Sequence, residues 1–184
     1  MPRKPLLHIF TQKDLEEDKI QSLNLCFLLG NDRSSEQDVE FAIKQLVEIA
    51  LRALSPGIND PFTAITCIDR LSTALILFME NANEAPYIYD ENGHLRVIED
   101  LTTFEGVVDA AFNQIRQTAS DNPAIVIRLL ERIKDVALHA KSRSHKDVLL
   151  EHAALIKNNA HQKIKEKRDL RDIDERYENV GNVL

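Results

Sequence analysis

The stretch Ala53–Ala64 reads ALSPGINDPFTA and joins two long segments whose apolar residues recur at helical spacing. Pro56 lacks an N–H and disfavours helical backbone in the residue before it. Gly57 can adopt the positive φ at which helices often end. Asp60 before Pro61 is typical of an N-cap followed by the first helical residue. The sequence therefore predicts two helices joined at a fixed angle by a short turn.

The polar residues of this turn allow two interpretations. A helix N-terminus offers unpaired N–H groups and the positive end of the helix dipole, so an anion or ligand site beside Asn59 and Asp60 is one hypothesis. The other is that both residues only cap the helix and shape the turn, which is the commoner use of Asn and Asp at such places. The sequence leaves both interpretations open.

The rest of the chain is predicted to be mainly helical, with about five packed helices. The helix after the turn has apolar residues on several sides, so we expect it to be central and buried. Asn122-Pro123 repeats the start signal, Ser35 with Asp38 resembles a capping box, and Ser144 is the expected cap of the last helix. The expected helices cover about 35–54, 61–81, 103–119, 123–142 and a segment from 145 onward.

Three short segments favour strands. Tyr87–Tyr89 and Leu95–Ile98 flank a turn that contains Asn92-Gly93, which is a strong hairpin signal. A lone hairpin is marginal, so we expect it to lie on the helical body or to pair with another strand. Apolar runs at 6–10 and 22–29 are candidates for one or two N-terminal strands, although the second run could also be helical.

These elements suggest three regions. Residues 1–34 form an N-terminal strand and turn segment, residues 35–160 form the helical core with its hairpin, and residues 161–184 form a charged helical extension or tail. The tail prediction depends on the many charges of both signs after Asn159, where the apolar stripe becomes sparse.

Composition excludes several classes of function. The 184 residues carry a net charge of −7, which argues against a nucleic-acid partner because phosphate binding needs a basic face. Cys26 and Cys67 have apolar neighbours, so reduced core cysteines are expected. No histidine pair has the spacing of a metal site, and no motif indicates a cofactor. The longest apolar run, 74–79, is short for a bilayer span, and we find no signal peptide, so the chain by itself is expected to be cytoplasmic.

Charged residues within apolar helices are the remaining candidates. Asp69 and Arg70 interrupt the most apolar helix, where a buried charge would need a partner. Arg52 and Asp60 are the partners that proximity to the turn suggests, either as a structural ion pair or as part of a site. The expected ligand-binding set is Arg52, Ser55, Asn59, Asp60, Asp69, Arg70 and Arg116.

Several motifs together resemble a known family. They are Gly30-x-x-Arg33, Asp38, the run QLVEIA at 45–50, the turn ALSPGINDPFTA, and AFNQIRQ at 111–117. This pattern is similar to that of the predicted bacterial membrane proteins filed as domain of unknown function 2254, over about residues 6–156. The resemblance implies several transmembrane helices ahead of this region, a location on the cytoplasmic side of the inner membrane, and no established activity, ligand or catalytic residue.

Three hypotheses follow. The first is a soluble regulatory or interaction domain, normally attached to a membrane segment, that binds a small ligand or a partner at the SPGINDP turn. The second is a hydrolase-like enzyme that uses Asp60 or Asp69 as acid or base, which requires a deep pocket and a raised carboxyl pKa. The third is a helical module that forms homo-oligomers through an apolar face of the first or fifth expected helix.

Overall fold

A computed structural model describes residues 7–11, 14–27, 39–82 and 85–184 of the chain. The chain divides into two compact units, residues 1–33 and residues 34–184, and each unit is described by itself. The elements are α1 (Glu17–Leu25) in the first unit and, in the second, α2 (Val39–Ala53), α3 (Pro61–Asn81), β1 (Tyr87–Tyr89), β2 (Leu95–Ile98), α4 (Phe104–Thr118), α5 (Pro123–His139), α6 (Arg143–Lys163) and α7 (Lys167–Gly181).

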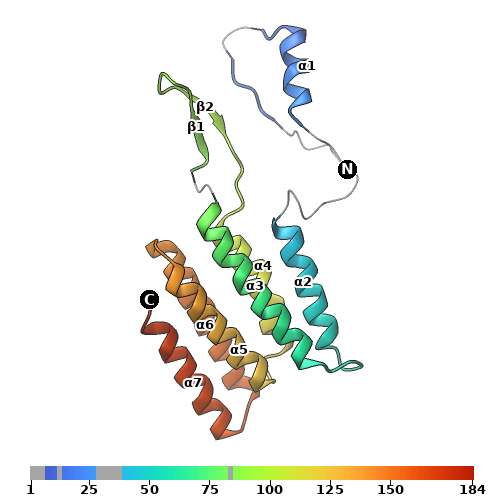
Figure 1. The fold of residues 1–184 in the computed structure, drawn as a ribbon, viewed down its shortest axis with the longest axis vertical. Helices are drawn as coiled ribbons and strands as arrows, with labels where there is room; N and C mark the ends of the chain where they lie inside the picture. Colours follow the sequence, from blue (N-terminus) through green and yellow to red (C-terminus); the bar gives the residue numbers. More distant parts are fainter. Residues whose placement is uncertain (1–6, 12–13, 28–38, 83–84) are drawn as a thin grey trace. The chain divides into compact units, whose positions relative to one another are not determined.

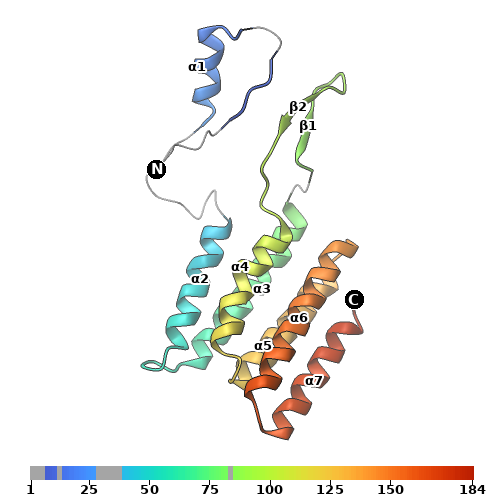
Figure 2. The ribbon, with the colours of Figure 1, turned by 180° about the vertical axis from the view of Figure 1, so that it is seen from behind.

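The helices of the second unit pack side by side in two layers. Helix α3 lies between α2 and α5, and α4 covers α2 and α3 on one side while also contacting α6 (Figure 1). Helix α6 packs on α4 and α5, and α7 closes the edge opposite α2 by packing on α5 and α6 (Figure 2). The predicted mainly helical fold class is confirmed. Helices α3 and α5 are neighbours in space, although α4 separates them in the sequence.

Local capping determines where these helices begin. Thr103, Asn122 and Ser142 each accept a hydrogen bond from a backbone N–H in the first turn of α4, α5 and α6. The cap of α6 is therefore Ser142, and the prediction of Ser144 was wrong because both serines precede the apolar stripe. The predicted start of the first helix, with Ser35 and Asp38, lies outside the described residues.

A continuous apolar core joins all six helices of the second unit. It is rich in aliphatic side chains, and its largest fully buried members come from α2 to α6: Ile43, Ile68, Leu71, Leu75, Phe112, Ile115, Ile125, Leu129, Leu130, Ile133, Leu149 and Ile156. Each fully buried Leu, Ile or Phe contributes about 1.5–3 kcal/mol of transfer free energy. The expectation that α3 is central is confirmed, since six of its residues are buried.

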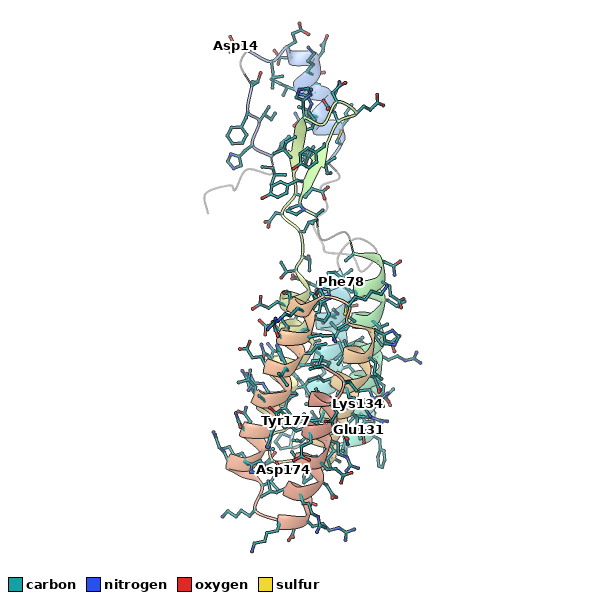
Figure 3. The ribbon with its side chains drawn as sticks, turned by 90° about the vertical axis from the view of Figure 1, so that its left-hand side faces the viewer. Asp14, Phe78, Glu131, Lys134, Asp174 and Tyr177 are labelled. Atoms are coloured by element: carbon teal, nitrogen blue, oxygen red, sulfur yellow. The ribbon has the colours of Figure 1, made fainter. Side chains whose placement is uncertain are left out.

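The charged C-terminal segment folds as a packed helix. Ile173 and Val180 of α7 are fully buried, and the ammonium of Lys157 in α6 lies 3.1 Å from the Asp174 carboxylate and 4.6 Å from the centre of the Tyr177 ring. Asp174 and Tyr177, labelled in Figure 3, therefore lie on the side of α7 that meets α6. Helix α7 therefore packs on the unit through its buried apolar residues, and its charged residues lie around them. The segment is a packed helix.

The N-terminal unit differs from the expected strands. Residues 22–25 belong to α1, and residues 7–11 form no regular structure, while Leu6 and residues 28–29 lie outside the described part of the chain. Helix α1 has no buried residue, and Cys26 at its end is exposed, whereas Cys67 is buried as expected. A short apolar run does not by itself distinguish strand from helix, which explains the error.

Helix α3 is long and apolar enough to cross a membrane by length and composition. It is the one helix of this kind among the described residues. Core helices of water-soluble proteins can have the same length and apolar composition. The buried face of α3 packs on α2 and α5, and Asp69 and Arg70 interrupt its middle. These contacts place one face of α3 in the core of this unit, and 33% of its apolar window is buried.

The predicted hairpin is present. Strands β1 and β2 pair antiparallel, with Ile88 opposite Val97, and Gly93 in the turn has φ of +78°. Its expected packing on the helical body is not observed, because among the described elements the two strands contact only each other.

The packing of α7 gives a direct prediction for stability. Replacing Ile173 by Ala should lower the free energy of unfolding by about 2–4 kcal/mol, because it leaves a cavity between α7 and α5. Urea denaturation of the full chain measures this value. The exposed Glu178 on the same helix is the matched control, and its replacement by Ala should change stability by less than about 0.5 kcal/mol. Equal small effects at both positions would mean that α7 is not part of the folded unit.

Candidate functional site

The turn between α2 and α3 is held by its own backbone. The Ser55 hydroxyl donates to the Arg52 carbonyl at 2.7 Å, and the Ser55 carbonyl accepts from the N–H groups of Ile58 and Asn59. The Asp60 N–H then donates to the Ala53 carbonyl at 2.7 Å, which closes the turn on the last residue of α2. The chain thus reverses direction with most of its polar backbone paired.

Asn59, and not Gly57, adopts the left-handed backbone conformation. Its φ is +48°, and it is the one non-glycine residue with positive φ among the described residues. The prediction that Gly57 supplies the positive φ was therefore wrong. Asn tolerates this conformation better than other non-glycine residues do. The Asn59 side chain is exposed and is not used as a cap.

Asp60 is the N-cap of α3. One carboxylate oxygen accepts from the N–H groups of Phe62 and Thr63 at 3.1 Å each, and the other accepts from the Thr63 hydroxyl at 2.6 Å. These bonds, chiefly the one from the Thr63 hydroxyl, lower the pKa of Asp60 below its usual value. Asp60 therefore stays ionised at neutral pH and is occupied by capping.

The start of α5 lies beside this turn and is built in the same way. The Asn122 side-chain oxygen accepts from the N–H groups of Ala124 and Ile125, and Pro123 follows as the first helical residue. The two junctions enclose an open depression of about 570 Å³. It is lined by Leu54, Pro56, Asn59, Thr118, Ala119, Asp121, Asn122 and Pro123.

The chemistry of this depression differs from that of an anion site. The N–H groups at the starts of α3 and α5 are already bonded to Asp60 and Asn122. The exposed polar groups that remain are the Asn59 amide, the Thr118 hydroxyl and the Asp121 carboxylate, and no Lys, Arg or His lines the depression. The Asp121 carboxylate gives the site a negative charge, and the Asn59 amide and the Thr118 hydroxyl can each accept or donate a hydrogen bond.

The charged candidates do not join this depression. Arg52 is exposed and lies 3.9 Å from Glu48 one turn earlier, and the Arg70 side chain is exposed. Asp69 does not pair with Arg52, and Arg70 forms no ion pair with Asp60, so the predicted pairing was wrong. The partners of Asp69 come from α5, which is distant in sequence.

Asp69 links α3 to α5 through arginines. Arg128 Nε lies 3.0 Å from one carboxylate oxygen without alignment for a hydrogen bond, and Arg128 Nη2 donates to the other at 3.2 Å. Arg132 lies 3.8 Å away, and Glu131 accepts from Arg128 at 3.2 Å and lies 3.9 Å from Arg176 of α7. Because about a third of each side chain is exposed, this network contributes modestly to stability and mainly fixes the orientation of the helices.

Arg116 belongs to a polar network between α4 and α6. It donates to the side-chain oxygen of Asn113 at 3.0 Å. It also donates to Asn159 of α6 at 2.6 Å when the Asn159 amide is oriented with its oxygen toward the arginine. In the same network the buried His152 places Nε2 3.1 Å from the Asp109 carboxylate. The structure thus separates Arg116 from the turn and adds His152, Asp109 and Asn159 as partners. No local sequence signal pairs His152 with Asp109, because the two residues lie on different helices.

No cluster of three or more His, Cys, Asp or Glu side chains suited to a metal occurs in residues 7–11, 14–27, 39–82 and 85–184.

The sequence that forms this site matches a known protein family. The model of the family described as "Predicted membrane protein (DUF2254)" matches residues 1–135, which include the whole turn and the depression. The chain belongs to this family. The matched region ends within α5, so the whole of α6 and α7 lies beyond it.

Curated relatives that this DUF2254 protein matches carry the name "Uncharacterized protein". One from Mycobacterium bovis and one from Mycobacterium tuberculosis strain H37Rv are each 30% identical over 141 residues, which are 77% of this chain and 27% of each relative. The chain therefore spans about a quarter of the length of these relatives. No solved structure matches it significantly.

The burial of His152 gives a prediction for pH dependence. Desolvation lowers the pKa of His152 below its usual value of 6.5, and the Asp109 carboxylate opposes this shift only in part. The unfolded chain therefore binds the proton more tightly, so protonation of His152 favours unfolding. The stability contributed by the neutral His152 side chain is present above about pH 6.5 and is lost as pH falls through the lowered folded-state pKa.

We expect the melting temperature to fall between pH 7 and pH 5, and to fall less in His152→Gln. Replacing the exposed His8 by Gln is the matched control for loss of a histidine. An identical pH dependence in His152→Gln and the natural chain would contradict the assignment.

Proposed function

We propose that α2–α7 form a cytosolic regulatory or interaction module of a membrane-anchored protein, with the depression between the two junctions as its binding site. Membership of a family of predicted membrane proteins supports the membrane attachment. The curated relatives are much longer than this chain, which leaves room in them for a membrane segment. The net charge of −7 is consistent with a module that works in water.

The observation that carries the proposal is the meeting of two Asx-Pro junctions at one open depression. Capping uses both carboxylate oxygens of Asp60 and the side-chain oxygen of Asn122. Asn59 has a strained backbone and an exposed amide that no cap needs. Strained residues gather at sites where structure holds a group for binding. Asn59 is therefore the residue of the turn whose role is separable from folding.

The chemistry of the lining specifies the ligand class. Asn59, Thr118 and Asp121 offer acceptors and a negative charge. Such a site suits a donor-bearing cation, either a small amine or guanidine or an Arg or Lys side chain of a partner, because charged hydrogen bonds are the stronger ones. This replaces the anion site that the helix N-termini alone suggested.

The enzyme hypothesis has weaker support. Asp60 has a lowered pKa and is bonded through both oxygens, so it is poorly suited as a general acid or base. Asp69 is paired with Arg128 and does not line the depression. The oligomer hypothesis, based on the first or fifth expected helix, finds only scattered exposed residues there, such as Ile49 on α2 and Leu150 on α6.

A titration tests the proposed site. Arginine amide and lysine amide, added to the isotope-labelled full chain, should shift the NMR signals of residues 54–60 and 118–123. Asn59→Gly keeps the positive φ but removes the amide, and Asp121→Asn removes the charge. Each should weaken binding at least fivefold with little change in melting temperature.

Asp147→Asn on the exposed face of α6 is the matched control for loss of one charge and should bind as the natural chain does. Shifts spread over the whole surface, or equal binding by Asp121→Asn and the natural chain, would refute the site. A large fall in melting temperature in Asn59→Gly would mean that the turn is purely structural.

A further inference from the structure

The hairpin exposes apolar residues on both faces. Every residue of β1 and β2 is exposed, and the large apolar side chains among them are 40–66% accessible: Tyr87, Ile88, Tyr89, Leu95, Val97 and Ile98. The strands contact only each other among the described elements. A two-stranded hairpin is marginal in water unless another strand or a packed layer supports it. Among the described elements the hairpin therefore has no supporting strand or packed layer.

The backbone of β1 shows which groups are free to pair. The Pro86 carbonyl accepts from Glu99, and the Asp90 N–H donates to the His94 carbonyl. Because bonding direction alternates along a strand, Pro86, Ile88 and Asp90 direct their backbone groups toward β2. Tyr87 and Tyr89 then direct their N–H and C=O groups to the open edge.

The two edges of the hairpin differ in charge. Strand β1 has no charged residue, whereas β2 carries Arg96, which is held 2.7 Å from the Asp90 carboxylate. Proteins commonly place charges on edge strands to prevent pairing with other chains. By this criterion β2 is protected, and β1 is the edge open to another strand.

We propose that β1 pairs with β1 of a second copy of this chain, antiparallel and centred on Ile88, to form a four-stranded sheet. In this register Tyr87 lies opposite Tyr89 of the other copy, so the free backbone groups of both residues match. The pairing forms four main-chain hydrogen bonds and two cross-strand tyrosine pairs. It is a two-fold symmetric contact, which closes at the dimer.

Charge placement favours a second copy in this register. Asp90 of one copy faces Pro86 of the other, so the acidic turns, with Asp90 and Glu91, point to opposite ends of the new sheet. A centre at Arg96 on β2 would instead place two arginines opposite each other, which is unfavourable. The contact is small compared with a standard interface, so we expect a dissociation constant of about 10–500 µM.

A charge exchange at the centre tests the pairing. The two Ile88 side chains are directly opposite in the dimer, so Ile88→Lys and Ile88→Asp should each be monomeric by sedimentation equilibrium at several hundred micromolar. Mixing the two variants should restore a dimer, because Lys then faces Asp. Ile98→Lys adds the same charge on β2 and should leave the natural dimer intact.

A disulfide provides a second, independent measurement. Opposite residues of a non-hydrogen-bonded antiparallel pair lie about 4.5 Å apart at Cα, within disulfide range. In a Cys26→Ser background, Ile88→Cys should form a covalent dimer in a glutathione redox buffer, and Val97→Cys on β2 should not.

Each contrary result would overturn the proposal. The first is a natural chain that stays monomeric together with an Ile88→Cys variant that forms no covalent dimer. The second is a natural dimer that Ile88→Lys does not weaken. The third is a mixture of the two charged variants that stays monomeric.

Discussion

The packing of α3 between α2 and α5 is the constraint on which the rest of the helical unit depends. Ile68, Leu71 and Leu75 are fully buried there, and α3 begins at a residue fixed by the Asp60 cap and Pro61. A helix this apolar must bury its surface in a core or in a membrane. The two-layer arrangement provides the core, and Arg128 of α5 neutralises the charge that interrupts the helix.

The same packing brings the two junctions together. Since α3 and α5 lie side by side and both start with an Asx-Pro pair, their N-terminal turns enclose one depression. The motif therefore has two separable parts. Asp60 and Pro61 determine where α3 starts, while Asn59 presents an amide to the depression at the cost of a strained backbone. This division explains how one turn can serve both folding and binding.

Features that depend on local sequence were predictable. The bounds of α3 and of both strands follow from signals within a few residues: Asp60-Pro61 at the start of α3 and Asn92-Gly93 in the hairpin turn. Where local signals were ambiguous, the prediction failed. Two serines close together made the cap of α6 uncertain. The apolar run at 22–29 fits a strand as well as it fits the helix to which residues 22–25 belong.

Features that depend on distant contacts were not predictable. Asp69 meets Arg128, which is 59 residues away, and no local pattern selects that arginine. The pairing of His152 with Asp109 has the same origin. A signal for α7 did exist, since Leu170, Ile173, Tyr177 and Val180 recur at helical spacing, but the surrounding charges obscured it. Sequence thus located the turn correctly and assigned it the wrong charged neighbours.

The central claim, that α3 is the core helix of a unit folded in water, is tested most directly by amide hydrogen exchange on the full chain. In detergent-free buffer we predict that the amides of Ile68 and Leu71 exchange only through global unfolding, as slowly as those of Leu129 in α5. Adding phosphatidylglycerol vesicles should leave these rates unchanged. Rapid exchange throughout α3 in buffer, with protection gained only when vesicles are present, would contradict the account and make α3 a membrane segment.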